Sequence, residues 1–368
     1  MISLLSLIAV LSTVSASGLL SIPFEKRRSK RDTNSLKRSS HFEPTHLQND
    51  YYEYMVNFCL GTPPQPLKAV LDTGSSDIWV YSQGAELNYD SSASSTSELV
   101  LENGFHVWYN DFTGAKGDYY KDVLTLGNVS VTTQFASDST FMASRPIGIF
   151  GIASPADEGT WGNIYPNYPY SLKDAGIIDA VAYSLYLDDA DSDYGQLLFG
   201  ALDKSKYTGE LSVLPSLNNY SFSVNASIYN ETIEVILDAG ASLSFVPDNI
   251  MSQIASDFGL TYDGNNNFYK AGSDRTKSLT YTFGNTEITV PPSELYHKLV
   301  SGSDDLYFTV LGSGESRDNN LLGDSFLRSA YVVYDMENNC IAIGQANHDA
   351  GEPDYEELTS DGVLGLSN

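Results

Sequence analysis

Short apolar runs that alternate with polar residues dominate the chain. Tyr54–Leu60 has the pattern of a strand, and runs of Val, Ile, Thr and Tyr of similar length recur between turns rich in Gly and Ser. Helical spacing of apolar residues is scarce. It is clearest at Pro247–Phe258 and weaker at Ser171–Ile178 and Ser293–Leu299. The pattern therefore predicts an all-β protein with a few short helices.

One motif places an acidic residue directly after a buried strand, and it occurs twice. A strand ending at Leu71 leads into Asp72, which is followed by a small residue, a Gly and Ser. The second copy, Val235–Ser242, has its acid at Asp238, 166 residues downstream. A carboxylate at the end of a buried strand is costly unless N–H groups and hydroxyls surround it. Such an acid is more often catalytic than a simple turn cap.

A second repeated element indicates that the chain is an internal duplication. Ile149-Phe150-Gly151 ends 79 residues after Asp72, and Leu321-Leu322-Gly323 ends 85 residues after Asp238. A fold with pseudo-two-fold symmetry would bring the two aspartates face to face between two lobes. Paired acids in such a position can share one proton.

The length of 368 residues suits two lobes of roughly 150 residues each. The strand pair Ala182–Leu187 and Gln196–Leu202 ends the first half, so the boundary is expected near Lys204. We expect two β lobes with a cleft between them, at residues 39–204 and 205–347, followed by an acidic tail at 348–368.

The N-terminus has the features of a secreted precursor. An apolar run, Leu4–Leu11, is followed by small residues that fit a signal peptidase site after Ala16, and it is too short to span a membrane. Dibasic pairs crowd residues 17–38, which predicts a basic pro-segment cut by a processing protease after Arg38. Four sequons agree with the secretory route, at Asn128, Asn219, Asn225 and Asn230. The tail lacks an apolar terminal stretch, so no lipid anchor is expected.

The charge balance is strongly acidic. The chain has 20 Lys and Arg against 47 Asp and Glu, a formal charge of −27. Without residues 1–38, 13 basic and 45 acidic residues remain, a charge of −32. Phosphates would be repelled, so nucleic acid is excluded as a partner. Protonation of some acids would relieve the self-repulsion, which indicates an acidic working environment.

Two further features leave alternatives open. Cys59 and Cys340 could form one bridge or stay buried as small apolar residues. Acids alternate at Asp189, Asp191 and Asp193, as in a calcium loop. However, Tyr194 stands where that loop needs Gly, and the closing Glu is absent. A solvated hairpin tip is the favoured interpretation, and no metal or cofactor is expected.

The Asp72 motif, Asp-Thr-Gly-Ser-Ser-Asp-Ile-Trp, and the preceding turn Gly61-Thr62-Pro63-Pro64-Gln65 resemble the start of a pepsin-family aspartic protease. The resemblance runs from about Tyr51 to Gln345 and is closest to the secreted yeast proteases called candidapepsins. The segment Leu322–Arg328 matches the family's Leu-Gly-Asp-x-Phe-Leu-Arg block. The resemblance implies a monomer that cuts proteins or peptides and binds pepstatin-like inhibitors, with Asp72 and Asp238 as catalysts.

The resemblance also implies a flap, a β-hairpin that covers the substrate, at Tyr109-Asn110-Asp111-Phe112. The family usually has Tyr-Gly-Asp-Gly here, so Asn110 and Phe112 depart from it, and two side chains in place of glycines would stiffen or reshape the tip. Phe112 could contact a substrate side chain or pack outside the hairpin. The expected substrate-binding residues are Gly74, Tyr109, Asn110, Asp111, Phe112, Gly240 and Ala241.

Supporting roles follow from the same resemblance. Ser75 matches a hydroxyl that donates to Asp72, and Trp79 matches the ring that holds the flap Tyr. Thr73 matches one of two threonines that interlock the loops beneath the acids, but its partner position is Ala239. Loss of that hydrogen bond costs roughly 1 kcal/mol. Ala241 replaces a donor to Asp238, so the second acid is expected to favour its protonated form.

Two functions remain as hypotheses. The first is a secreted aspartic endopeptidase, and the second is a catalytically silent pepsin-like binding protein whose losses at Ala239 and Ala241 mark decay. Other hydrolases fit worse, because the five histidines form no His-Glu-x-x-His pair. Gly240-Ala241-Ser242-Leu243-Ser244 lacks the last glycine of a serine nucleophile elbow. A two-carboxylate glycosidase would leave the flap unexplained.

Overall fold

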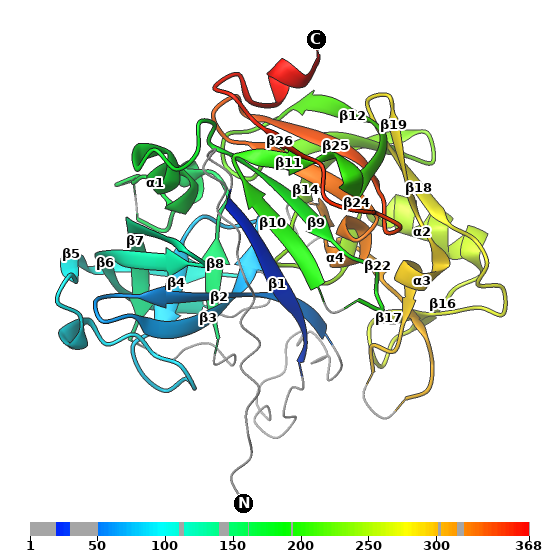
Figure 1. Cartoon of the computed structure of the whole chain (residues 1–368). Coiled ribbons are helices and arrows are strands. Elements are labelled where there is room, and N and C mark those ends of the chain that lie inside the picture. The colour runs from blue at the N-terminus through cyan, green and yellow to red at the C-terminus, as the bar shows by residue number, and fades with distance from the viewer. Residues whose placement is uncertain are drawn as a thin grey trace, which may run out of the picture.

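The computed structural model describes residues 20–29, 51–109, 114–139, 147–160, 162–192, 194–300, 303–314 and 320–367. It consists mainly of β-strands gathered into two lobes, as predicted, with the first lobe on the left and the second on the right in Figure 1. One apolar core cluster contains buried residues of both lobes, among them Leu71, Leu237 and Tyr334. The lobes are therefore held together by packing.

The first lobe is built from seven strands that follow one another along the chain. Its flap region is the long hairpin of β5 and β6, in which Trp108 pairs with Gly114. The bounds are β2 (Tyr51–Leu60), β3 (Gln65–Asp72), β4 (Ile78–Tyr81), β5 (Glu98–Trp108), β6 (Gly114–Leu126), β7 (Val129–Asp138) and β8 (Gly148–Gly151).

A central group of strands joins the lobes. Strand β9 of the first half pairs antiparallel with β24 of the second, within a sheet of order β12-β25-β24-β9-β10-β1-β2-β3-β8-β4-β7-β6-β5. The hairpin β9–β10 confirms the predicted strand pair. The bounds are β9 (Ala182–Leu187), β10 (Tyr194–Phe199), β12 (Tyr207–Pro215), β24 (Ala330–Asp335) and β25 (Cys340–Ala346).

The second lobe contains a seven-stranded and a four-stranded sheet. The larger sheet comprises β13 (Ser223–Ile228), β14 (Glu231–Leu237), β15 (Ser244–Val246), β18 (Leu279–Phe283), β19 (Thr286–Val290), β22 (Val310–Gly312) and β23 (Asn320–Leu322). The smaller comprises β16 (Thr261–Asp263), β17 (Phe268–Lys270), β20 (Tyr296–His297) and β21 (Tyr307–Phe308).

The helices are few and short. The predicted helix at Pro247–Phe258 is α2 (Asp248–Phe258), which buries one apolar face and ends at the left-handed Gly259. The weaker candidates give α1 (Tyr168–Asp174) and the single turn α3 (Pro292–Leu295), while α4 (Asp324–Leu327) was not predicted. Short 3-10 turns lie at Ser91–Ala93, Pro155–Asp157, Lys204–Lys206 and Gly362–Ser367.

The duplication predicted from the sequence is present as a repeated strand arrangement. Strand β3 runs parallel to β8, so that Leu71 pairs with Phe150. Strand β14 runs parallel to β23, so that Leu237 pairs with Leu322. Each aspartate thus leaves a strand that lies beside its own apolar-apolar-Gly element.

The glycine that ends each of these elements is required by a close backbone contact. A Cβ atom on Gly151 would lie 2.5 Å from the carbonyl oxygen of Asp77, and one on Gly323 would lie 2.2 Å from that of Ala241. Both distances are too short for a carbon next to an oxygen, so only Gly lets the aspartate loop pass this closely. This close contact explains why both apolar-apolar-Gly elements end in glycine.

The N-terminal end of the described chain joins the central sheet, and the C-terminal end contributes to a separate two-stranded sheet. Strand β1 (Leu20–Ser29), within the predicted pro-segment, pairs with both β10 and β2 (Figure 1). Near the C-terminus, β26 (Tyr355–Glu357) pairs with β11 (Ala201–Asp203), and Leu358 and Val363 are buried. The acidic tail therefore packs on the protein body along much of its length. Signal peptide residues 1–16 lie outside the described residues.

The structure decides between the alternatives for the two cysteines. Cys59 on β2 is partly exposed, Cys340 on β25 is buried, and both are free thiols. Burial raises the pKa of Cys340 to about 12, so this thiol stays protonated and unreactive. Within the described residues no helix is long and apolar enough to cross a membrane.

Candidate active site

Asp72 and Asp238 lie against each other where β3 and β14 end. A Cβ atom on Gly74 would stand 2.6 Å from the carboxyl carbon of Asp238, and one on Gly240 would stand 2.6 Å from Oδ1 of Asp72. Each loop therefore presents its glycine to the carboxyl group of the other loop. The two carboxyl groups also share a hydrogen bond. The pseudo-two-fold arrangement predicted from the sequence is present at this site.

Asp72 is surrounded by hydrogen-bond donors from its own loop. Its Oδ1 accepts from the backbone N–H of Gly74 at 2.8 Å and of Ser75 at 3.1 Å. Its Oδ2 accepts from the Ser75 hydroxyl at 2.5 Å. Asp72 itself is buried. Several donors around a carboxyl group favour its charged form. The hydrogen bond from Ser75 to Asp72 that the sequence predicted is present.

Asp238 has a poorer set of donors. Its Oδ1 accepts from the backbone N–H of Gly240 at 2.8 Å, and the N–H of Gly74 also reaches the carboxyl group. Ala241, at the position of Ser75, has no hydroxyl to add. Burial and then the charge of Asp72 raise the pKa of Asp238 well above its ordinary value. The direction agrees with the expectation from the sequence.

Thr73 ties the two loops together from below. Its hydroxyl donates to the carbonyl oxygen of Leu237 at 2.9 Å and accepts from the N–H of Ala239 at 2.9 Å. Thr73 and Ala239 are both buried. The equivalent two hydrogen bonds from residue 239 to the first loop cannot form, because alanine has no hydroxyl. One half of the interlock predicted from the family is therefore in place.

The flap residue Tyr109 lies over the Asp72 loop. The indole N–H of Trp79 donates to its hydroxyl at 2.7 Å, and Ser75 also interacts with it. Burial, and next the negative charge of Asp72, raise the pKa of Tyr109 well above its usual value. The predicted contact between Trp79 and Tyr109 is thus present. Asn110, Asp111 and Phe112 lie outside the described residues.

A buried network behind Tyr109 was missed by the sequence analysis. Asp77 accepts hydrogen bonds from the hydroxyls of Tyr119 and Tyr165, each at 2.8 Å, and from the N–H of Gly159 at 2.7 Å. The network connects the Asp72 loop to the base of the flap hairpin and to the segment after β8. The signal available in the sequence was an acid directly before the apolar run that begins at Ile78.

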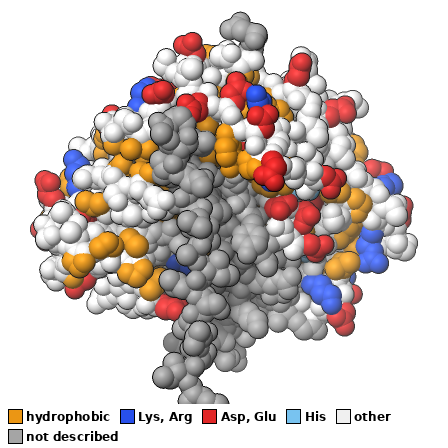
Figure 2. All heavy atoms as spheres, in the orientation of Figure 1, with side chains coloured by type: hydrophobic (Ala, Val, Ile, Leu, Met, Phe, Trp, Pro, Cys, Tyr) orange, Lys and Arg blue, Asp and Glu red, His pale blue; other side chains and the backbone are white. Residues whose placement is uncertain are grey.

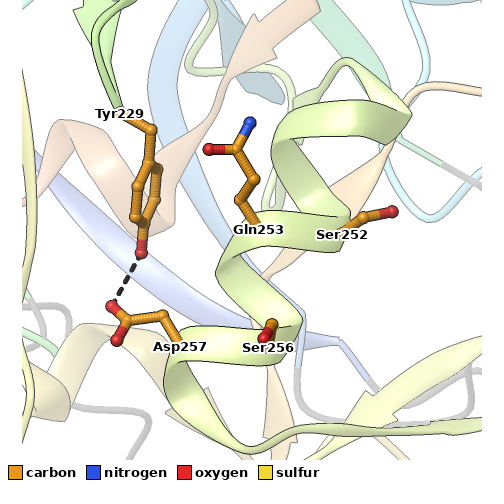
Figure 3. Close-up of a pocket in the computed structure, with 5 residues that line it drawn as sticks. All are labelled: Tyr229, Ser252, Gln253, Ser256 and Asp257. Carbon is orange, nitrogen blue, oxygen red and sulfur yellow. Dashed lines mark hydrogen bonds between the residues drawn. The ribbon is translucent and has the colours of Figure 1, made fainter.

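Other candidate features lie apart from the two aspartates. At the β9–β10 turn, Asp189 accepts from the N–H groups of Asp191 and Ser192, which is the geometry of a closed hairpin tip. An open hollow lies on α2, where Tyr229 donates to Asp257 at 2.9 Å (Figure 3). It is lined by Tyr229, Ser252, Gln253, Ser256 and Asp257. None of the predicted site residues lines this hollow.

Two β lobes that each contribute one aspartate to a common site, with a tyrosine of a hairpin above it, define the class of bilobal aspartic proteases. The chain belongs to the eukaryotic aspartyl protease family, whose model matches residues 53–346. It is therefore an aspartic-type endopeptidase, which acts on peptide bonds.

Curated relatives agree with this assignment. The chain is 34% identical over 330 residues to candidapepsin-3 and to secreted aspartic protease 3, both of Candida albicans, which covers 83% of this chain and 82% of each relative. It is 35% identical over 329 residues to an acid protease of Saccharomycopsis fibuligera, covering 82% of this chain and 83% of that protein. The resemblance to candidapepsins predicted from the motifs is confirmed.

Proposed function

We propose that the protein is a secreted endopeptidase in which Asp72 and Asp238 together activate a water molecule at acidic pH. The observation that carries this proposal is the contact of the two carboxyl groups across Gly74 and Gly240. Two carboxyl groups this close do not both ionise, so one acts as base while the other keeps its proton.

The unequal donor sets suggest how the two acids divide the work. The ionised Asp72 takes a proton from the water molecule while the water oxygen attacks the peptide carbonyl carbon. At the same time, Asp238 gives its proton to the carbonyl oxygen. The tetrahedral intermediate then breaks its C–N bond. The leaving nitrogen takes the proton held by Asp72, and Asp238 recovers one from the intermediate. No covalent enzyme intermediate is needed, and the pair titrates as a unit.

The proposed substrate lies between the aspartates and the flap, with Tyr109 over it and Trp79 holding Tyr109. Gly240 and Ala241 would line the second-lobe side of the bound substrate. Asn110, Asp111 and Phe112 would line its other side, from the flap tip. The excess of acids favours work at low pH, and acidic side chains are spread over both lobes on the visible face (Figure 2). Unfolded protein or peptide is the proposed substrate class, and pepstatin-like compounds are the proposed inhibitors.

The secretory part of the proposal rests on the predicted signal peptide and pro-segment. We propose cleavage after Ala16 and after Arg38, which leaves a monomeric enzyme of two lobes, residues 39–204 and 205–347, with its tail. The four sequon asparagines are all exposed, which makes each one accessible to a glycan. N-terminal sequencing should find Ser39 first, and a glycosidase that removes N-linked glycans should lower the mass of the secreted protein.

The central test is cleavage of denatured globin at about pH 4, near the upper titration of such a pair. We expect pepstatin-sensitive cleavage that falls at least about 100-fold in Asp72→Asn and in Asp238→Asn, the loss typical for a missing acid or base. Asp263→Asn, a change of an acid on β16, is the matched control and should keep full activity. Absence of pepstatin-sensitive cleavage over a pH series would instead favour a silent binding protein.

A further inference from the structure

Because Ala239 has no hydroxyl, the hydroxyl of Thr73 makes the side-chain hydrogen bonds that join the two loops beneath the aspartates, as far as the described residues show. That residue makes both of its bonds to the second loop, through the carbonyl oxygen of Leu237 and the N–H of Ala239. Leu237 is the residue directly before Asp238. The position of the second aspartate therefore depends strongly on what else holds the Leu237 carbonyl.

Tyr334 supplies a second hydroxyl at this point. Its side chain belongs to β24 of the central sheet, is fully buried, and donates to the carbonyl oxygen of Leu237 at 3.0 Å. The same hydroxyl lies 3.4 Å from Oγ1 of Thr73. A carbonyl oxygen has two lone pairs, so it can accept from Thr73 and Tyr334 together.

We propose that Tyr334 is a positioning residue of the active site, which holds the Asp238 loop in register with the Asp72 loop where the usual second hydroxyl is absent. The proposal rests on the two-aspartate reaction described above. Tyr334 touches neither aspartate, so its effect passes through Leu237 and Thr73. Because the reaction needs both carboxyl groups on one water, a small displacement of Asp238 lowers the rate of the chemical step.

The packing around Tyr334 fixes where its hydroxyl points. Its ring stacks on Tyr183 of β9 with centroids 4.8 Å apart and an interplanar angle of 21°, and Phe222 meets it edge-on at 5.9 Å. Tyr183 and Tyr334 are paired residues of neighbouring strands in the central sheet. A ring held on two sides in this way keeps its hydroxyl at the carbonyl without further loss of side-chain entropy.

Tyr183 provides a matched control for the hydroxyl. It is as buried as Tyr334 and belongs to the same ring stack, but its hydroxyl has no hydrogen-bond partner among the described residues. Removing this oxygen leaves the stacking intact and breaks no bond seen in that part of the chain. Tyr183→Phe and Tyr334→Phe therefore differ in the hydrogen bond to Leu237 and in little else.

The test compares kcat and KM for a fluorogenic peptide in four proteins: the parent enzyme, Tyr334→Phe, Tyr183→Phe, and Tyr334→Phe combined with Ala239→Ser. We expect Tyr334→Phe to lower kcat about three- to ten-fold, the effect of one lost hydrogen bond, with KM changed less than about two-fold. Tyr183→Phe should leave kcat unchanged. Ala239→Ser restores the missing hydroxyl of the interlock and should return most of the lost kcat.

The outcomes separate this proposal from the assignment of function. Equal kcat for Tyr334→Phe and Tyr183→Phe, or a loss in Tyr334→Phe that Ala239→Ser does not repair, would overturn the positioning role while leaving the enzyme intact. A parent enzyme without pepstatin-sensitive activity would instead contradict the proposed function. Thermal unfolding of each variant shows whether a loss of activity reflects unfolded protein, and a kcat loss that merely follows the unfolded fraction also contradicts the proposal.

Discussion

The two aspartate loops have the same backbone plan but different chemical surroundings. Asp72 accepts from two N–H groups and the Ser75 hydroxyl of its own loop, whereas Asp238 accepts from the N–H groups of Gly240 and Gly74 and has Ala241 beside it. The first loop surrounds its carboxyl group with more donors, whereas burial and the charge of Asp72 raise the pKa of Asp238 in the second loop. The duplicated fold thus provides the symmetry, and a hydroxyl at Ser75 with none at Ala241 makes the surroundings of the two acids unequal.

The difference continues away from the two carboxyl groups. Asp77 of the first loop lies in a network of tyrosine hydroxyls. The residue 166 positions later is Leu243, which packs in an apolar cluster with Phe268, Leu299 and Tyr307. Only the first lobe carries the flap hairpin predicted by the sequence, and its loop is the one joined to that hairpin by polar contacts. The second lobe is supported by apolar packing at the same place.

The shared backbone plan can be broken at its two glycines, and we expect the largest effect here. Gly151→Ala and Gly323→Ala should each destabilise the fold by about 3 kcal/mol, because the new Cβ meets a carbonyl oxygen at 2.5 Å or 2.2 Å. Urea denaturation measures the change. Gly351→Ala, where a Cβ meets nothing within 4 Å, is the control. If only one of the two glycines proved sensitive, the structural equivalence of the halves would be wrong.

The next effect concerns the tie between the loops. Thr73→Val keeps the shape of the side chain but leaves the N–H of Ala239 without its acceptor, so we expect a loss of about 2 kcal/mol in the free energy of unfolding, with lower kcat. Thr132→Val on the exposed face of β7 should change neither quantity. If the free energy of unfolding of Thr73→Val equalled that of the parent protein, the hydrogen bonds of the Thr73 hydroxyl would not stabilise the contact between the lobes.

The electrostatic contrast can be reduced by giving the second loop a hydroxyl. In Ala241→Ser the new donor can reach Asp238 as Ser75 reaches Asp72, and it favours the charged form. The pKa of Asp238 should fall, so the singly protonated pair is lost at lower pH. We expect the alkaline limb of the pH–kcat/KM profile to move down by about one unit. A limb that stays in place would show that burial and the charge of Asp72 alone determine this titration.

The polar network of the first lobe predicts a smaller, pH-dependent effect on stability. Burial, followed by the charge of Asp77, raises the pKa of Glu158 from 4.5 to about 9. The folded protein then keeps a proton that the unfolded chain loses, so this stabilisation is complete below pH 4.5 and declines as pH rises toward 9.

Glu158→Gln, neutral at every pH, should therefore flatten the fall in the urea midpoint between about pH 4 and about pH 8. Because water reaches part of this side chain, the expected difference is below about 1 kcal/mol. Glu102→Gln, at an exposed acid of β5, should keep the slope of the parent protein. An identical slope in Glu158→Gln would contradict a Glu158 that keeps its proton in the folded protein.

Much of the site could be predicted because its signals are local. The strand before Asp72, the glycines and the repeat at Asp238 each follow from a few adjacent residues, and the structure places them as expected. The role of Asp77 could not be predicted, because one acid beside an apolar run gives no sign of the two tyrosines that donate to it. Tyr334 was missed for the same reason, since it lies 261 positions from the Thr73 hydroxyl that it approaches.

The sequence by itself determined the all-β class, the duplication and the two acids, because alternation, small residues and repeated spacing are properties of neighbouring residues. Only the tertiary structure decided which hydroxyls hold the Leu237 carbonyl in the absence of one at Ala239, and that tyrosines surround Asp77. Both depend on hydroxyls, charges and burial contributed by strands far apart in the chain, and such contacts leave no periodic pattern in the sequence. In this protein, Thr73 and Tyr334 belong to or follow strands of the thirteen-stranded sheet, and both reach the carbonyl oxygen of Leu237 in the seven-stranded sheet.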